Sequence, residues 1–371
     1  MKNKKKVLYF VSEDYYFLSH RIDLARDALK RGYKVVLLSN MNKDEDYIKS
    51  QGIKTIHIPI ERSSKNLLSD IFLLTKIFKI IKQEGPDILH CVSLKPILYG
   101  TFCARLIGKI KIVNTFAGLG ILVKYQSNFF KQFIINFFLR LIIKSENVRL
   151  IVQNKSDKKY FLRNKIIEEK NLNLILGSGV DMKKYSQSLE KRRVVNIILV
   201  SRMLWSKGIS EFVKVSKKFK KNKLVRFTLV GSPDEKNPDS VSQKYLEKLN
   251  SLSNFSWKGF SNDVKKELNN ADIFFLPTSY GEGIPKALIE AAASGLALVV
   301  SNNPGCKEIV DNEINGYICD CKNLEEFYFV LNKLIHSNEL RTRFGNSARK
   351  KVEFDFSLEK INEKTLSLYN S

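Results

Sequence analysis

Two glycines and a carboxylate stand together in the second half of the chain, where an apolar run gives way to a helical pattern. The apolar run 272–276 is followed by the loop 277–284, in which Glu282 lies between Gly281 and Gly283. Glycines let a ligand approach the backbone closely, and the N–H groups at the start of a helix favour an anion or hydroxyl groups. The pattern therefore predicts a site for phosphate or for the hydroxyls of a polyol.

The helix that this loop opens carries a second acid. Pro285 suits the first helical position, and Gly295 suits the residue just after the helix end. Glu290 lies eight residues after Glu282, about two turns along, and so lies on roughly the same face. On a helix of small apolar residues it needs a partner, and a ribose diol would serve. Taken alone, Glu282 is better explained as a solvated surface charge, but the loop, both acids and the helix together favour a binding site.

A second loop carries two cations at short spacing. Arg202 and Lys207 follow the apolar run 194–200 and precede Gly208, where the next helical pattern begins. Arginine supplies planar donors and lysine a mobile charge, which together suit a diphosphate. Two ordinary surface bases are the alternative, since the chain has 63 Lys and Arg. The position favours a site, because both loops lie at the same edge of the same predicted sheet.

The charge of the whole chain limits its partners. The 371 residues carry 63 Lys and Arg against 38 Asp and Glu, a net charge of +25. Residues 91–150 hold nine of these bases and one acid, Glu146. Nucleic acid, anionic lipid and phosphorylated substrates are the candidate partners. The alternative is a composition rich in Lys, Ile and Asn, which AT-rich genomes produce without selection for function.

Cysteine and histidine usage gives no indication of a metal site or a disulfide framework. The five cysteines form no Cys-x-x-Cys pair, and the four histidines lie far apart. We therefore expect reduced thiols, no metal and no cofactor. The basic start of the chain is followed by only five apolar residues, too few for a signal peptide, and no segment has the ~18 apolar residues of a membrane helix. These features predict a cytoplasmic protein.

Short apolar runs alternate with longer helical patterns through most of the chain. Apolar runs without alternation favour strands buried on both faces, and so parallel sheets covered by helices. The expected strands are 7–11, 34–38, 55–58, 87–91, 111–114, 149–152 and 173–176, then 194–200, 225–230, 255–257, 272–276 and 296–301. A polar stretch at 182–193 separates the two series and predicts a linker. We expect an α/β protein of two Rossmann-like parallel-sheet domains that face a cleft, residues 1–185 and 193–354.

Several motifs together resemble the retaining family-four glycosyltransferases of GT-B fold. The specific motifs are Arg202…Lys207-Gly208 and Glu282-Gly283-Ile284-Pro285…Glu290. Looser matches are Gly179-Val180-Asp181, Leu18-Ser19-His20-Arg21, Gly85-Pro86-Asp87-Ile88-Leu89-His90 and the segment 113–120. The first-half segments are similar to the bacterial branch that extends lipid-diphosphate-linked sugars for O-antigen, capsule or protein glycans. The resemblance covers nearly the whole chain.

The resemblance implies a hexosyltransferase that acts in lipopolysaccharide, O-antigen, capsule or glycan biosynthesis. It would move an N-acetylhexosamine or related hexose from a UDP-sugar to an undecaprenyl-diphosphate-type lipid-linked saccharide, with retention of anomeric configuration and without a metal. We name no enzymic nucleophile. Residues 1–185 would form the acceptor side and 193–354 the donor side, with a helix at about 355–371 crossing back onto the first domain. The protein would be peripheral on the inner face of the plasma membrane.

The resemblance also implies roles for the residues of the two loops. Arg202 and Lys207 would neutralise the donor diphosphate and stabilise the departing nucleotide. Glu282, with nearby backbone amides, would hold hydroxyls of the transferred sugar, and Glu290 would bind the ribose. The donor-binding set is Arg202, Lys207, Gly281, Glu282, Gly283, Ile284, Pro285 and Glu290, of which Arg202, Lys207 and Glu282 are the catalytic candidates.

The chain departs from the family pattern on the acceptor side. Many relatives have a Gly-Gly turn after the first strand, where this chain has Ser12-Glu13-Asp14, and many have a His near Thr115, which is missing here. A catalytic or sugar-contacting His is therefore not carried over to this place. His20 and His90 are candidates by position, and a structural role is the alternative for each. The acceptor-side candidates are Ser12, His20, Lys95, Thr115 and Gly118.

Residues 124–144 form a basic, aromatic helical pattern. Large apolar residues recur at helical spacing, and Lys131, Asn136 and Arg140 lie between them. One interpretation is a helix that lies on an anionic membrane surface. The alternative is a core helix whose far face is basic. A lipid-linked acceptor favours the membrane.

Other functions stay open on the sequence alone. A UDP-sugar epimerase of GT-B type would show the same two halves, although the acids and cations of the second half favour transfer. A nicotinamide-dependent dehydrogenase would carry Gly-x-Gly-x-x-Gly after the first strand, and this chain does not. A basic nucleic-acid-binding α/β protein would explain the charge, but no recognisable binding module is present.

Overall fold

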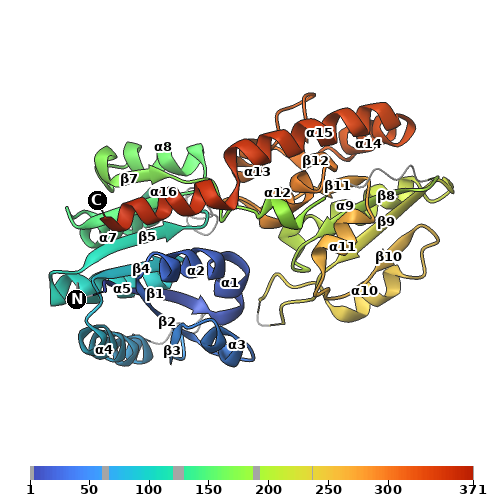
Figure 1. Ribbon diagram of the computed structural model, residues 1–371. Helices are drawn as coiled ribbons and strands as arrows, with labels where there is room; N and C mark the ends of the chain where they lie inside the picture. The colour runs from blue at the N-terminus through green and yellow to red at the C-terminus, as the bar shows by residue number, and fades with distance from the viewer. Residues whose placement is uncertain (1–3, 61–66, 120–128, 187–192, 236, 371) are drawn as a thin grey trace. The chain divides into compact units, whose positions relative to one another are not determined.

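The computed structural model describes residues 4–60, 67–119, 129–186, 193–235 and 237–370 (Figure 1). The chain divides into two compact units: unit 1 is Met1–Ser178 with Glu359–Ser371, and unit 2 is Gly179–Leu358. The first break thus comes before the polar stretch 182–193, of which 187–192 lie outside the described residues. Each unit is a parallel sheet with helices, so the predicted fold class is confirmed.

The described part of unit 1 contains a seven-stranded parallel sheet in the order β3-β2-β1-β4-β5-β6-β7. Its strands are β1 (Lys6–Glu13), β2 (Lys34–Asn40), β3 (Lys54–His57), β4 (Ile88–Val92), β5 (Lys111–Phe116), β6 (Val148–Val152) and β7 (Leu172–Leu174). Its helices are α1 (Asp14–His20), α2 (Ile22–Lys30), α3 (Glu45–Ser50), α4 (Leu67–Glu84), α5 (Leu94–Ile107), α7 (Phe129–Ile143), α8 (Lys155–Arg163), the 3₁₀ turn η1 (Glu169–Asn171) and α16 (Leu358–Asn370).

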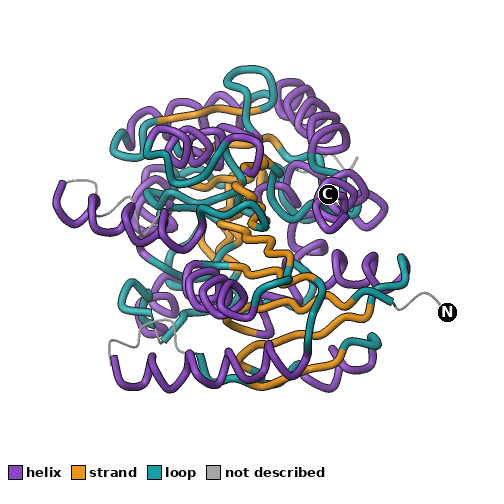
Figure 2. Tube along the Cα trace, turned by 90° about the vertical axis from the view of Figure 1, so that its left-hand side faces the viewer, coloured by secondary structure: helices purple, strands orange, loops and turns teal. Residues whose placement is uncertain are grey.

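Helices cover both faces of this sheet (Figures 1 and 2). On one face α4, α5 and α8 bury Ile77, Ile97 and Phe161 against the strands. On the other face α2 and α16 bury Leu24 and Leu366. Successive residues of β1 alternate between the two hydrophobic clusters, as expected for a strand with apolar side chains on both sides.

α16 belongs to unit 1 although it follows unit 2 in the sequence. Its inner face buries Ile361, Leu366 and Tyr369 in the same cluster as β1. The Tyr369 hydroxyl lies 2.6 Å from Nδ1 of His90 and donates to the Tyr9 hydroxyl at 3.0 Å. The helix therefore completes one face of the core.

The described part of unit 2 contains a six-stranded parallel sheet in the order β10-β9-β8-β11-β12-β13. Its strands are β8 (Val195–Val200), β9 (Val225–Val230), β10 (Phe255–Trp257), β11 (Ile273–Leu276), β12 (Ala297–Ser301) and β13 (Gly316–Cys319). Its helices are η2 (Met182–Lys184), η3 (Trp205–Lys207), α9 (Ile209–Lys218), α10 (Gln243–Leu249), α11 (Val264–Asn269), α12 (Lys286–Ala293), α13 (Pro304–Ile309), α14 (Leu324–His336) and α15 (Asn338–Asp355).

Aromatic side chains fill the core of unit 2. Phe212 of α9 stacks on Phe275 of β11, with ring centroids 5.5 Å apart, and meets Phe227 of β9 edge to face. The ring centroid of Phe327 in α14 lies 5.0 Å from that of Phe275. These contacts join helices to the central strands, which fixes where the loops at the strand ends emerge.

Both ends of α12 are set by local backbone chemistry. Pro285 is the N-cap, with an extended backbone, so the prediction that it is the first helical residue is wrong by one position. At the other end Gly295 has φ +74°, its N–H donates to Ala292 at 3.0 Å, and the N–H of Leu296 donates to Ala291 at 3.1 Å. This is the Schellman arrangement, and the predicted helix end at Gly295 is confirmed.

Candidate functional site

The two loops predicted to carry chemistry follow neighbouring strands of unit 2. Loop 201–208 follows β8 and loop 277–285 follows β11, and Ile197 pairs with Ile273 across these two parallel strands. β9 and β10 lie on one side of this pair, and β12 and β13 lie on the other. The strand order therefore reverses here, and such switch points are where parallel sheets bind ligands beyond the carboxyl ends of their strands.

One cation and one acid meet between these loops. Nζ of Lys207 lies 2.5 Å from Oε2 of Glu282, and the side chains are 13% and 17% exposed. The buried thiol of Cys306 in α13 is close enough to respond to both charges. Burial raises the pKa of Cys306, Glu282 raises it further, and Lys207 lowers it. A phosphate or hydroxyl ligand at this place would meet a cation and an acceptor together.

Backbone contacts hold the two loops to each other. The carbonyl of Ser206 accepts the N–H of Ser279 and the hydroxyl of Thr278, each at 3.0 Å. Gly208 has φ +82°, and a Cβ at this position would lie 2.2 Å from the carbonyl oxygen of Pro277. Glycine is therefore required here by both backbone conformation and close approach.

The glycine-rich loop also packs against α13. A Cβ on Gly305 would lie 1.7 Å from the carbonyl oxygen of Gly283, so the loop and the helix touch backbone to backbone. Gly281 and Ile284 complete this loop, and Ile284 is buried. The Pro285 carbonyl accepts the first intrahelical bonds of α12. The first N–H groups of α12, at the positive end of its dipole, thus follow directly on the loop that carries Glu282.

Glu290 lies one helical turn after a lysine, and its side chain is 13% exposed. Oε1 of Glu290 lies 3.6 Å from Nζ of Lys286, and the Tyr185 hydroxyl bonds the same carboxyl group. Burial raises the pKa of Glu290, while Lys286 and Tyr185 lower it. Burial and the neighbouring Glu290 both raise the pKa of Tyr185, so this phenol stays a hydrogen-bond donor. The Glu290 carboxyl group was predicted to pair with a ribose, and in this structure it pairs with a tyrosine and a lysine.

The other predicted cation has an acidic partner. Nη1 of Arg202 donates to Oδ2 of Asp234 at 2.7 Å, and the two side chains are 44% and 26% exposed. Asp234 lies in the loop 231–241 after β9, where the sequence shows no motif. The composition of this loop is polar, as in any surface loop, and does not indicate a binding site.

This third loop pairs closely with the loop that carries Arg202. The N–H of Met203 donates to Ser232 at 3.0 Å, and the N–H of Val241 donates back to Met203 at 2.9 Å. Asp239 accepts the N–H of Trp205 through its carbonyl at 2.9 Å, and its carboxylate accepts the N–H of Ser206 at 3.0 Å. Three loops, after β8, β9 and β11, therefore form the candidate site.

Of the predicted acceptor-side residues, Ser12 and Thr115 lie buried in strands. β1 continues through Ser12 to Glu13, and α1 begins directly at Asp14, whose carboxylate accepts the N–H of Asn42 at 2.5 Å. The Thr115 hydroxyl lies 2.8 Å from Nε2 of His90.

His90 is fully buried between Thr115 and Tyr369. Burial lowers the pKa of His90 far below its usual value, and the charge of Arg21 lowers it further. The imidazole is therefore neutral, and its contacts match the structural alternative considered for this histidine.

The other acceptor-side candidates lie closer to the surface. His20 ends α1, where its ring stacks on Tyr16 with centroids 4.2 Å apart, and its Nδ1 lies 2.6 Å from the Ser19 hydroxyl. Nζ of Lys95 lies 3.9 Å from Oδ1 of Asp70. Gly118 has φ +112° in the loop after β5, and residues 120–128 of that loop lie outside the described part of the chain.

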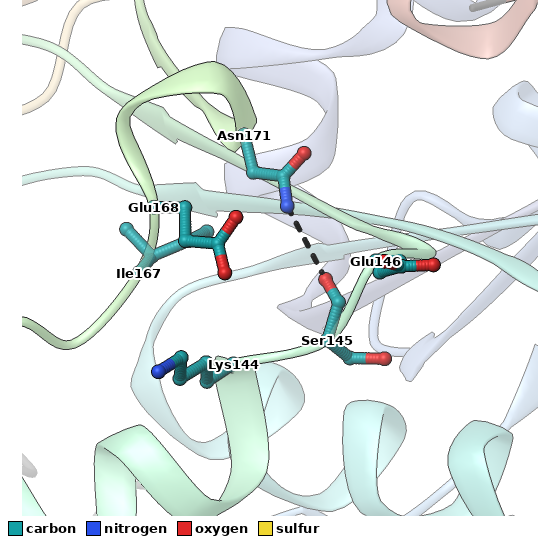
Figure 3. A pocket seen from close by; sticks show the side chains of 6 residues that line it. All are labelled: Lys144, Ser145, Glu146, Ile167, Glu168 and Asn171. Carbon is teal, nitrogen blue, oxygen red and sulfur yellow. Dashed lines mark hydrogen bonds between the residues drawn. The ribbon is translucent and has the colours of Figure 1, made fainter.

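A hollow of about 240 Å³ in unit 1 lies away from these positions (Figure 3). Its lining includes Lys144 and Glu146, which precede β6, and Glu168 and Asn171, which precede β7. It thus lies at the amino ends of the strands, opposite the edge where parallel sheets bind ligands. In the described residues no group of three His, Cys, Asp or Glu side chains is arranged to hold a metal ion.

The predicted basic, aromatic helix is α7, and residues 124–128 of the predicted range lie outside the described residues. Its inner face buries Leu139 and Ile143 in the core. Its outer face carries large apolar side chains that are each 38–71% exposed: Phe130, Phe133, Ile134, Phe137, Phe138 and Leu141. α7 is therefore a core helix with an apolar outer face. Among the described helices, none is long and apolar enough to cross a membrane.

Comparison with known protein families places both halves of the chain. Residues 6–154 match the family described as glycosyl transferase 4-like. Residues 181–351 match the glycosyl transferases group 1 family. The second match contains all three loops of the candidate site.

Characterised relatives and solved structures extend over nearly the whole chain. An N,N'-diacetylbacillosaminyl-diphospho-undecaprenol alpha-1,3-N-acetylgalactosaminyltransferase of Campylobacter jejuni is 29% identical, over 95% of this chain and 97% of that protein. A UDP-Gal:alpha-D-GlcNAc-diphosphoundecaprenol alpha-1,3-galactosyltransferase of Escherichia coli is 25% identical, over 87% of this chain and 85% of that protein. The Anabaena protein HepE, solved with UDP and glucose, has a TM-score of 0.78 at 14% identity, and the match covers 98% of each chain.

Proposed function

Because this chain belongs to the GT-B glycosyltransferases, with a glycosyl transferase 4-like domain followed by a glycosyl transferases group 1 domain, we propose that it transfers a sugar from a UDP-sugar to a lipid-diphosphate-linked saccharide. The acceptor class is supported by the names of the two relatives described above, and the donor nucleotide by the UDP-Gal in the name of the Escherichia coli relative. An N-acetylhexosamine or related hexose is the proposed transferred sugar. The reaction then takes place at the inner face of the plasma membrane.

The observation that carries this proposal is the contact between Lys207 and Glu282 at the switch point of unit 2. Lys207 supplies a charge for the donor diphosphate, and Arg202 supplies planar donors beside it. Glu282 lies in the loop that opens α12, where it accepts hydrogen bonds from hydroxyls of the transferred sugar. Glu290 lies farther along the same helix and accepts the ribose hydroxyls.

Charge stabilisation drives the proposed chemistry. The bond from the anomeric carbon to the diphosphate breaks, and negative charge grows on the leaving oxygen. Arg202, Lys207 and the amino end of α12 are fixed donors that stabilise this charge without a metal. For retention, the acceptor hydroxyl attacks from the face that the diphosphate leaves. Its proton then passes to the departing phosphate oxygen, and no enzymic nucleophile is needed.

We also propose that α7 docks unit 1 on an anionic membrane, where a lipid-linked acceptor is held. The outer face of α7 is apolar and aromatic, with Phe130 the most exposed of its side chains at 71%. The neighbouring helix α5 adds Phe102 and Leu106, which are also exposed, and Arg105 of α5 donates to the carbonyl of Ile142 at 2.9 Å. An apolar face with a basic surround is typical of helices that lie in the membrane interface.

The test is a transfer assay with a panel of UDP-sugars and a short-chain lipid-diphosphate saccharide. We expect UDP release only when both substrates are present, and a product whose new linkage keeps the donor's anomeric configuration by NMR. Arg202→Ala and Glu282→Ala should each lower kcat by about 10²–10³-fold. The exposed Lys214→Ala on α9 is the matched control and should keep the wild-type rate. Epimerisation of the donor without acceptor, or wild-type rates in both variants, would contradict the proposal.

A further inference from the structure

A groove of about 280 Å³ lies beside the outer face of α7 in unit 1. One wall is α7, with Phe133, Phe137 and Arg140. The other is the end of α8 and the residues that follow it, including Arg163 and Lys165. The lining holds three cations and no acid. Such a surface is complementary to a phosphate group.

The floor of the groove is fixed by hydrogen bonds between α7 and α8. Asn136, which is 8% exposed, donates to Oδ1 of Asn164 at 2.9 Å and accepts the Tyr160 hydroxyl at 2.6 Å. Nη2 of Arg140 donates to the Asn164 carbonyl at 2.7 Å. This bond uses one of the five N–H donors of Arg140 and holds the guanidinium at the groove, with its other donors left over. Arg140, one of the three cations, is thus held in place by α8.

The rim of the groove is apolar where the floor is polar. Phe133 and Phe137 are 62% and 51% exposed, and they line the groove while belonging to the outer face of α7. A ligand that fits both features carries a phosphate next to hydrocarbon. A lipid headgroup at the surface of a bilayer has this chemistry.

We propose that this groove binds the phosphate of an anionic lipid headgroup, while Phe133 and Phe137 enter the bilayer interface around it. The inference rests on the membrane docking of α7 proposed above, and it adds a defined headgroup site to that docking. Single-stranded nucleic acid also combines phosphates with aromatic contacts. It is disfavoured because the same apolar face continues through Ile134 and Leu141, whose aliphatic side chains offer bases nothing to stack on.

The test compares two double variants of the full chain that remove the same charge. The groove variant is Arg163→Gln with Lys165→Gln, and the control is Lys109→Gln with Lys144→Gln, outside the groove. Each pair contains one lysine with positive φ, Lys165 at 50° and Lys109 at 58°, so backbone strain is matched. Binding is measured by sedimentation with vesicles of phosphatidylcholine, with and without phosphatidylglycerol.

We expect the groove variant to bind phosphatidylglycerol vesicles roughly 20- to 30-fold more weakly than the wild type, at about fivefold per cation. The control should lose clearly less, and both variants should bind UDP as the wild type does. Equal losses in the two variants would mean that general surface charge suffices and would overturn the site. A groove variant that loses binding to an oligonucleotide but not to vesicles would overturn the choice of ligand. If wild-type protein transfers sugar to a short-chain acceptor yet binds no vesicles, the docking of α7 fails together with this site, while the transferase activity stands.

Discussion

Asp157 makes the stability of unit 1 depend on pH in a direction opposite to that of most carboxylates. It lies in the first turn of α8 and is 6% exposed, and its Oδ2 has no hydrogen-bond partner among the described residues. Burial raises its pKa from 3.8 to about 6, although the Asn154 side chain and the Leu119 backbone lower it. Between pH 3.8 and about pH 6, Asp157 therefore keeps its proton in the folded chain and has lost it in the unfolded chain. The free energy of unfolding therefore falls as pH rises through this window.

The perturbation is Asp157→Asn, which keeps the shape of the side chain and removes the charge. The raised pKa corresponds to a loss of about 3 kcal/mol in the wild type between about pH 4 and pH 7. The variant should not show this loss. An unpaired Nδ2 group in the variant costs about 1–3 kcal/mol at every pH, so the difference in slope is a sharper quantity than the difference in stability at one pH.

Urea unfolding across this pH range measures the slope. Both tryptophans, Trp205 and Trp257, lie in unit 2, so a transition seen by far-UV circular dichroism and not by tryptophan fluorescence belongs to unit 1. Asp263→Asn, at the exposed N-cap of α11 in unit 2, is the matched control and should leave the unit 1 slope unchanged. Parallel slopes for wild type and Asp157→Asn would refute the reasoning.

Three further predictions concern the proposed donor site. Asp234→Asn should strengthen UDP binding, measured by calorimetry, by up to about fivefold. The reason is that its partly exposed ion pair, worth about 0.2–1 kcal/mol, no longer competes with UDP for Arg202. Weaker UDP binding in the variant would mean that Asp234 orients the arginine instead. Gly305→Ala should destabilise unit 2 by about 1–3 kcal/mol in tryptophan-monitored unfolding and should weaken UDP binding. The reason is that the added Cβ would lie 1.7 Å from the carbonyl oxygen of Gly283. Unchanged stability would show that the loop around Gly283 moves aside at no cost. In the wild type, affinity for a UDP-sugar should rise as pH rises above 4.5, because the carboxyl group of Glu290, whose pKa is raised, ionises there. In Glu290→Gln the affinity should not change over this range. The same pH profile in both proteins would contradict the proposed contact between Glu290 and the ribose.

The framework of the fold was predictable because the strands are short runs of apolar residues without alternation. β9 and β10 were predicted to the residue, and the other predicted strands differ by only a few residues at their ends. β13 was missed because Gly316–Cys319 is short and begins with glycine. The sequence gives little sign of α15, because its 18 residues are mostly polar and bury only a narrow stripe that includes Phe344 and Val352.

The candidate site was predictable only where residue type and position both carried information. Glu282 and Lys207 follow strands that are neighbours in the sheet, so their meeting could be expected from the topology. Asp234 and Asp239 lie in a loop of ordinary composition, and their contacts depend on how that loop pairs with its neighbour. Tyr185 lies in the polar stretch taken as a linker, and no local pattern links it to Glu290.

The return of α16 to unit 1 has a consequence for how the chain acquires its structure during synthesis. A ribosome makes all of unit 2 before it makes Glu359–Ser371, which supply Ile361, Leu366 and Tyr369 to the core beside β1. Unit 2 can therefore mature on the nascent chain while that face of unit 1 still exposes its apolar side chains. Unit 1 is therefore the first unit to be started and the last to be completed. Until α16 is made, the uncovered apolar face of unit 1 is the surface of the nascent chain that is most exposed to aggregation and to chaperone binding.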